Sequence, residues 1–307
     1  MYKEKRLFRS EFVPIRGLRY HVHRWGDASQ TPSALPSLVL VHGWMDVGAS
    51  YQFMVDAFSD AFVQGRVIIA PDWRGFGQTG SGQADNFWFP DYLADLDFLL
   101  DHYAPGQAVD LVGHSMGGNV AMIYSGVRPQ RIRKLVNLEG FGLPATRPSQ
   151  APGRYAKWMD ELKSLHRGEM ALKGYDDASG VARRLMKTNP RLPADKADWL
   201  ARHWARPDAD GTWQILGDAG HKITSAQLYR LDEMMEIYQC ISAPTLAIEA
   251  SDDSLSRWWR GLYSLAEYHE RLKRVPQAST AVIGDAGHML HHDQPAQLAH
   301  LIENFLA

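Results

Sequence analysis

Residues 108–118 read AVDLVGHSMGG, and the stretch NVAMIYSGV follows at 119–127. Gly113, Ser115 and Gly117 form a Gly-x-Ser-x-Gly pattern between an apolar run and a helix-like segment, which is typical of a sharp strand-to-helix turn. On such a turn the serine hydroxyl projects outward, while the glycines let backbone pass closely without a Cβ clash. The helix start adds free N–H groups where an oxyanion would form. The sequence therefore predicts Ser115 as a nucleophile.

Short runs rich in Val, Ile and Leu recur on both sides of this motif. They lack polar alternation, so we expect strands buried on both faces of a parallel sheet. Residues 7–24 are instead typical of an antiparallel pair at the sheet edge, with Gly17 in the turn. The runs are SLVLVHG (37–43), RVIIAPD (66–72), AVDLVGH (108–114), RKLVNLEG (133–140), PTLAIEA (244–250) and STAVIGD (279–285).

Helical periodicity falls between the apolar runs, as at residues 90–103 and 298–305. This alternation predicts an α/β fold with a doubly wound sheet. The rhythm stops between 144 and 239, where no Val/Ile-rich run occurs and proline is frequent. We interpret that stretch as a mostly helical insertion into a core of residues 1–143 and 240–307. Its expected helices are 154–166, 178–187, 194–205 and 226–238.

The oxyanion of an acyl-transfer intermediate needs two preorganised donors. One is expected from the backbone N–H of Met116, directly after the nucleophile. The second is expected from the loop after an earlier strand, where the sequence reads HGW at 42–44. We therefore predict the backbone N–H of Trp44 as the other donor.

The segment GDAGHMLHHDQP, at 284–295, follows the last apolar run and precedes the last helical one. His288 is expected at the carboxyl edge of the sheet, where catalytic groups of open α/β sheets gather, and its ordinary pKa suits a general base. A metal site from His288, His291 and Asp293 is conceivable. The serine motif already explains one histidine without a metal, so we predict no metal and no cofactor. His291 and His292 are expected to face solvent or to support the site.

With these motifs and PDWRGFGQTG at 71–80, the chain resembles the α/β-hydrolase superfamily over nearly its whole length, and specifically its esterase-like members with a cap domain. The resemblance implies a mostly parallel eight-stranded sheet with helices on both faces. It also implies that residues 144–239 form a helical cap, or lid. The PDWRGFGQTG stretch would be a structural turn, although Asp72 and Arg74 resemble a catalytic pair.

The resemblance also implies an acid that orients the histidine. In the family it usually follows the seventh strand in a Gly-x-x-Asp loop. Here that loop reads ASDDS, and Ala250 replaces the glycine, so only the spacing selects Asp253. Asp252 is its neighbour and an alternative. Some members place the acid after the sixth strand, where this chain has Glu139.

A serine nucleophile distinguishes this chain from relatives that use aspartate or cysteine at that position. We expect a carboxylesterase-like serine hydrolase that acts on a small-molecule ester through an acyl-enzyme on Ser115. Carbon–carbon bond, lactone or amide hydrolysis, cofactor-free haloperoxidase activity and a non-catalytic small-molecule receptor remain alternatives. The insertion is expected to supply substrate-pocket walls through Trp158, Met159, Trp204 and Trp213.

The composition limits the other classes of partner. The formal net charge is -2 and no dense basic run occurs, so nucleic-acid binding is not expected. The single cysteine excludes an internal disulfide and a cysteine-based zinc cluster. The sequence contains neither the apolar stretch of a secretory leader nor one long enough to span a membrane. These features predict a cytoplasmic protein, and they leave its oligomeric state open.

Overall fold

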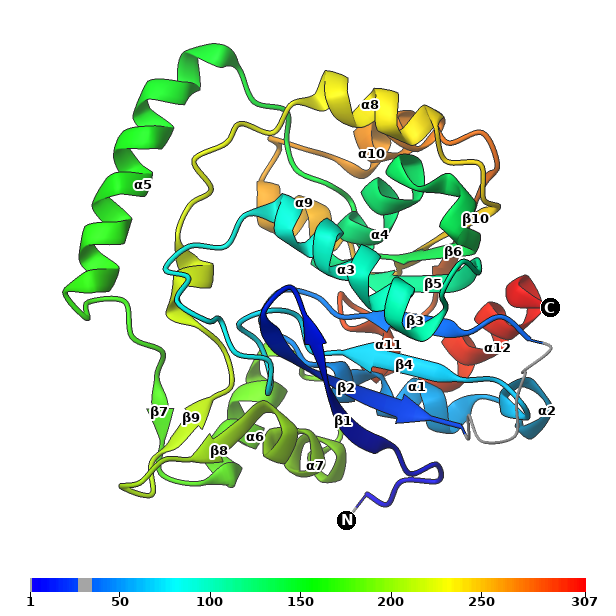
Figure 1. The fold of residues 1–307 in the computed structure, drawn as a ribbon, viewed down its shortest axis with the longest axis horizontal. Coiled ribbons are helices and arrows are strands. Elements are labelled where there is room, and N and C mark those ends of the chain that lie inside the picture. Colours follow the sequence, from blue (N-terminus) through cyan, green and yellow to red (C-terminus); the bar gives the residue numbers. More distant parts are fainter. Residues whose placement is uncertain (1, 27–34) are drawn as a thin grey trace.

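The computed structural model describes residues 2–26 and 35–307. Its centre is an eight-stranded sheet with the strand order β1-β2-β4-β3-β5-β6-β10-β11 (Figure 1). The strands are β1 Arg9–Ile15, β2 Leu18–Trp25, β3 Leu38–Val41, β4 Ile68–Pro71, β5 Val109–His114, β6 Ile132–Leu138, β10 Thr245–Ala250 and β11 Ala278–Ile283. Only β2 runs antiparallel to its neighbours β1 and β4, and the other pairs are parallel. The predicted α/β fold with a mostly parallel sheet is confirmed.

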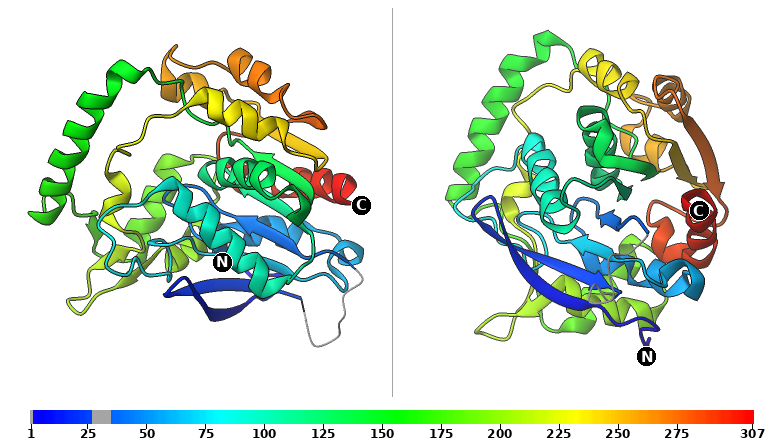
Figure 2. Two further views of the ribbon diagram at one scale, coloured as in Figure 1. Left: turned by 45° about the horizontal axis from the view of Figure 1, so that its top comes forward. Right: turned by 45° about the vertical axis from the view of Figure 1, so that its right-hand side comes forward.

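Helices cover both faces of this sheet (Figure 2). The α-helices in the described part of the chain are α1 Gln52–Ala57, α2 Asp60–Val63, α3 Phe89–Tyr103, α4 Met116–Val127, α5 Ala151–His166, α6 Ala178–Thr188, α7 Ala194–Trp204, α8 Leu231–Gln239, α9 Ser254–Trp259, α10 Leu265–Leu272, α11 Leu290–Asp293 and α12 Pro295–Leu306. One buried cluster joins α3, α4, α8 and α10 to one face, and a second joins α1 and α12 to the other. No helix in the described part of the chain is long and apolar enough to cross a membrane.

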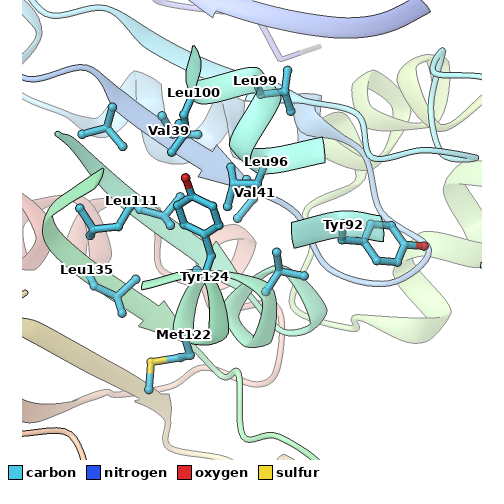
Figure 3. Packing of buried hydrophobic residues seen from close by; sticks show 14 of the residues in the cluster. Val39, Val41, Tyr92, Leu96, Leu99, Leu100, Leu111, Met122, Tyr124 and Leu135 are labelled. Carbon is cyan, nitrogen blue, oxygen red and sulfur yellow. The ribbon is translucent and has the colours of Figure 1, made fainter. Parts of the chain in front are cut away.

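The apolar stripes of α3 and α4 explain their packing on the sheet. Leu96 and Leu99 of α3, three positions apart, are fully buried, as is Tyr124 of α4 (Figure 3). The Tyr124 ring lies among Val39 and Leu111 of the sheet, and its hydroxyl donates to Asp97 Oδ1 at 2.7 Å. This packing holds α3 and α4 against β3 and β5 of the sheet.

The chain between β6 and β10 contains α5 to α8 and a second, three-stranded sheet. Its strands are β7 Gly174–Tyr175, β8 Ala205–Pro207 and β9 Trp213–Ile215. The sequence predicted a mostly helical stretch without these strands, because strands of two or three residues leave no apolar run. The expected helix at 226–238 begins only at Leu231. Figure 1 shows α5 standing apart from the main sheet, and no α5 residue is buried.

One expectation about the main sheet was wrong. β11 is an edge strand, and its Val282 is 65% exposed, so this run is not buried on both faces. Strands inside the sheet, which have a neighbouring strand on each side, are the ones buried on both faces.

All six strands from β3 onward in the main sheet are parallel, so their carboxyl ends lie at one edge. Residues that directly follow them meet there, and this edge carries the candidate site.

Candidate active site

Ser115 lies between the end of β5 and the start of α4 in a strained conformation. Its backbone has φ 53° and ψ −117°, which a side-chain-bearing residue rarely adopts. Its N–H donates to the Leu138 carbonyl oxygen at 2.8 Å, and its own carbonyl accepts from Asn119 N at 2.9 Å. Such strain persists only where the surroundings impose it, and it is commonly found at functional sites. The strand-to-helix turn expected from the motif is present.

Close backbone packing at Gly117 holds this turn in place. A Cβ there would lie 2.2 Å from the Val41 carbonyl oxygen, a backbone atom that cannot move aside. We expect Gly117→Ala to lower the free energy of unfolding by about 3 kcal/mol, as overpacking does. Chemical denaturation followed by circular dichroism measures the change.

Gly153, in α5, is the matched control because a Cβ there meets no atom within 4 Å. Gly153→Ala is expected to be neutral or to stabilise by up to about 1 kcal/mol through helix propensity. If Gly117→Ala proved as stable as Gly153→Ala, the tight approach of α4 to β3 would be wrong.

His288 follows β11 and contacts His114, the residue that precedes Ser115. His114 Nε2 is 2.7 Å from the His288 carbonyl oxygen, and the two ring centroids are 4.7 Å apart. The Trp258 ring packs edge-on against His288 at 4.2 Å. Burial lowers the pKa of His288 to about 3, so the ring is neutral at pH 7 and able to accept a proton.

Glu139 is the carboxylate that contacts this histidine. His288 Nδ1 lies 3.2 Å from Glu139 Oε2, and the Glu139 side chain is almost fully buried. Its other oxygen accepts a hydrogen bond from Ala250 N at 2.8 Å. Glu139 directly follows β6 and has φ 54°, so it is a second strained residue at the same sheet edge. Burial raises the pKa of Glu139 to about 7.

Asp253 and Asp252, the other two acids considered from the sequence, have different partners. Asp253 caps the start of α9, where its carboxylate accepts from Ser256 N at 2.8 Å and from the Ser256 hydroxyl. Asp252 pairs with Arg191 through two contacts, at 2.8 and 3.2 Å. Within the described residues, neither carboxylate has a hydrogen bond to His288.

A cavity of about 240 Å³ contains both Ser115 and His288. Trp44, expected to supply an oxyanion donor, also lines it, and Met116 follows Ser115 as the first residue of α4. The Trp44 side chain is more than half exposed, and its Nε1 donates to the His221 carbonyl at 3.2 Å. The wall also includes Arg191, Trp258 and two residues of α6, Leu185 and Thr188, which the sequence did not assign to the pocket.

The four residues proposed as pocket walls separate in the structure. Trp204, at the end of α7, lines the cavity and donates from Nε1 to Asp46 Oδ1 at 3.0 Å. Trp158 and Met159 lie on α5, and Trp213 lies on β9. None of these three is among the described residues around the cavity. Scattered tryptophans carry no positional signal, so their spacing could not identify the pocket.

Asp72 and Arg74 have separate structural partners, as the turn interpretation expects. Asp72 accepts from Gly48 N at 2.7 Å and Gln78 N at 2.9 Å, and lies 2.7 Å from His21 Nδ1. Arg74 makes a two-fold ion pair with the buried Asp95, with both contacts at 2.6 Å.

His291 and His292 are both buried, so of the two roles expected for them, facing solvent is wrong and a supporting role is left. His292 Nε2 lies 2.8 Å from the Ser50 hydroxyl. Asp46 and His114 join them beneath the nucleophile, and sequence reasoning overlooked both. His114 was visible as the variable residue before Ser115, whereas no local pattern marks Asp46.

Comparisons with known proteins agree with the fold. The family model described as alpha/beta hydrolase fold matches residues 36–295. A serine hydrolase-like protein of Danio rerio is 23% identical over 97% of this chain and 88% of its own length. The sn-1-specific diacylglycerol lipase ABHD11 of Mus musculus is 26% identical over 92% of this chain and 83% of its own. Among solved structures, a thioesterase domain from the curacin biosynthetic pathway has a TM-score of 0.79 at 24% identity, covering 96% and 99% of the two chains. The chain belongs to the alpha/beta hydrolase fold family.

Proposed function

We propose that this chain is a serine hydrolase that cleaves small-molecule carboxylic esters through an acyl-enzyme on Ser115. The arrangement of Ser115, His288 and Glu139 carries the proposal. Ser115 and His288 share one cavity, and the far side of the His288 ring contacts a buried carboxylate. A nucleophile next to a base, with the base held by an acid, is the recurring arrangement of acyl-transfer hydrolases.

In the proposed reaction, the Ser115 hydroxyl oxygen attacks the ester carbonyl carbon while His288 Nε2 takes its proton. The tetrahedral intermediate then collapses, and the proton passes to the leaving alcohol. Water activated by the same nitrogen attacks the acyl-enzyme, which releases the acid and regenerates Ser115. The backbone N–H groups of Met116 and Trp44 are the proposed donors to the oxyanion.

Glu139 is the acid that we propose for this reaction. As an ionised carboxylate, it would hold the proton on His288 Nδ1, leaving Nε2 free to accept from Ser115, and would stabilise the imidazolium. The hydrogen bond from Ala250 N fixes its other oxygen. Asp253 is less suited, because both of its carboxylate oxygens are engaged by Ser256 at the start of α9.

The cavity volume supports small acyl groups. At about 240 Å³ it is smaller than typical pockets for drug-sized ligands, which start at about 300 Å³. We therefore propose short-chain esters as the first substrates to test. The insertion between β6 and β10, which contributes Leu185 and Trp204 to the wall, is proposed to act as the cap.

The first experiment is covalent labelling with a fluorophosphonate, followed by intact mass and peptide mapping. We expect one adduct on the peptide that contains Ser115, and turnover of acetyl and butyryl p-nitrophenyl esters. His288→Ala should slow labelling by about 100-fold or more, since general-base assistance contributes that much. A thioester and an anilide with the same acyl groups test the neighbouring reaction classes.

His269→Ala is the matched control for His288→Ala. His269 also pairs with a glutamate, with its Nε2 2.7 Å from Glu249 Oε1, but it lies outside the residues that line the cavity. Its removal should leave the labelling rate unchanged. A folded parent that takes no label, yet binds esters saturably without product, would contradict the proposal and favour a small-molecule receptor.

A further inference from the structure

Beneath Ser115 lies a group of buried side chains that the ester chemistry does not use. Asp46, His114 and His291 are each at most 3% exposed. Four of their polar atoms, Asp46 Oδ2, His114 Nδ1 and both ring nitrogens of His291, have no hydrogen-bond partner in the part of the chain that the structure describes. Buried polar atoms are nearly always satisfied, so this concentration requires an explanation.

The two histidines are suited to act as metal ligands. His114 Nε2 donates to the His288 carbonyl oxygen at 2.7 Å, so a neutral His114 carries its free lone pair on Nδ1. Burial lowers the pKa of His114 to about 3 and that of His291 to about 4. Both rings are therefore neutral at pH 7, as metal binding requires.

Asp46 offers the remaining ligand. Its Oδ1 accepts three hydrogen bonds, from Val47 N at 2.9 Å, the Ser50 hydroxyl at 2.6 Å and Trp204 Nε1 at 3.0 Å. These donors fix the orientation of the carboxylate and leave Oδ2 free. An outer shell of this kind is what holds the ligands of natural metal sites in place.

The distances match a shared ion better than direct hydrogen bonds. Asp46 Oδ2 and His291 Nε2 are 3.8 Å apart, too far for a hydrogen bond. Two ligand atoms at about 2.1 Å from one tetrahedral Zn²⁺ lie about 3.4 Å apart. One ligand atom from each of Asp46, His114 and His291 lies within 4.8 Å of the others.

We propose that Asp46, His114 and His291 form a binding site for a divalent transition-metal ion, with Zn²⁺ the best match. Two imidazoles and one carboxylate suit Zn²⁺, whereas Mg²⁺ prefers oxygen ligands and octahedral geometry. Asp46 and His114 line the cavity that contains Ser115, so an ion reaches them from that side. The proposal is independent of the ester-hydrolase function.

This ligand set differs from the one considered from the sequence. Asp293 accepts from Gly287 N at 2.8 Å and Asn189 Nδ2 at 2.7 Å, and His288 contacts Glu139. A second histidine–carboxylate group, His21, His23 and Asp72, is less suited to an ion. Both Asp72 oxygens already accept backbone hydrogen bonds, and among the fully buried side-chain atoms described for that group only His23 Nδ1 lacks a partner.

The test is equilibrium dialysis of the untagged full chain against Zn²⁺ at pH 7, with bound metal measured by mass spectrometry. We expect one Zn²⁺ per chain, a higher melting temperature with Zn²⁺ but not Mg²⁺, and the visible absorption of tetrahedral Co²⁺ on substitution. His291→Phe and Asp46→Asn should each weaken Zn²⁺ binding by about 100-fold or more.

Phenylalanine suits position 291 because neither ring nitrogen of His291 is hydrogen-bonded and the ring packs against Tyr51 at 5.2 Å. Circular dichroism verifies the fold, and Asp46→Asn provides the test if His291→Phe fails to fold. His23→Phe is the matched control, and it should keep Zn²⁺. A folded parent that binds no Zn²⁺, or zinc lost from His23→Phe but kept by His291→Phe, would overturn the proposal.

Discussion

Ser115→Ala is expected to lower kcat/KM for the best ester by about 10⁴-fold or more, while the protein remains folded. The loss is large because nucleophile and base act as a unit, so removing one member costs nearly as much as removing all. Alanine also removes no hydrogen bond that holds the turn. The contacts of residue 115 that fix the start of α4 are backbone ones, to Leu138 and Asn119. Initial rates over a range of substrate concentration measure the effect.

Ser125→Ala is the matched control because Ser125 is a buried serine on the same helix, α4. Its hydroxyl donates to the Ala121 carbonyl oxygen at 2.7 Å, away from the cavity. That variant should keep the parent's kcat/KM and lose at most about 1.5 kcal/mol of stability. Residual activity of Ser115→Ala within tenfold of the parent would exclude an acyl-enzyme on Ser115.

The strand-to-helix turn was predictable because its determinants are local. The apolar run before Gly113, the glycines that allow close packing and the helix that follows all lie within twenty residues. The same holds for the eight-stranded sheet, whose interior strands are short apolar runs. The small sheet of β7, β8 and β9 could not be predicted, because its strands are only two or three residues long and β7 pairs with a strand far along the chain, Gly174 with Gln214.

Which carboxylate contacts His288 depends on tertiary structure, which the spacing of residues along the sequence does not indicate. Asp253 has the expected offset from β10, yet a serine three residues later draws its carboxylate onto the start of α9. Glu139 directly follows a different strand, β6, and the register between β6 and β10 brings its carboxylate to the Ala250 N–H. Likewise, the burial of His291 depends on how α11 packs, which its polar sequence does not indicate.

Glu139→Gln is expected to lower kcat by about 10³- to 10⁴-fold, as replacing the triad carboxylate by an amide does in serine proteases. Glutamine keeps the size of the side chain and can still accept from Ala250 N, but it cannot stabilise an imidazolium at His288. Asp253→Asn is the matched control, since it makes the same carboxylate-to-amide change in the other candidate acid. It should leave kcat within about threefold of the parent, because its amide oxygen can still cap α9.

The pH dependence separates these two carboxylates further. Burial raises the pKa of Glu139 to about 7, so below that pH it is protonated and cannot support His288. The kcat/KM of the parent should therefore rise as the pH increases through about 7 and level off above it. Asp253→Asn should retain this rise and Glu139→Gln should lose it, because glutamine does not titrate. A reversed result, in which only Asp253→Asn lost the rise and most of kcat, would mean that the loop after β10 turns toward His288 during turnover and that Asp253 is the acid.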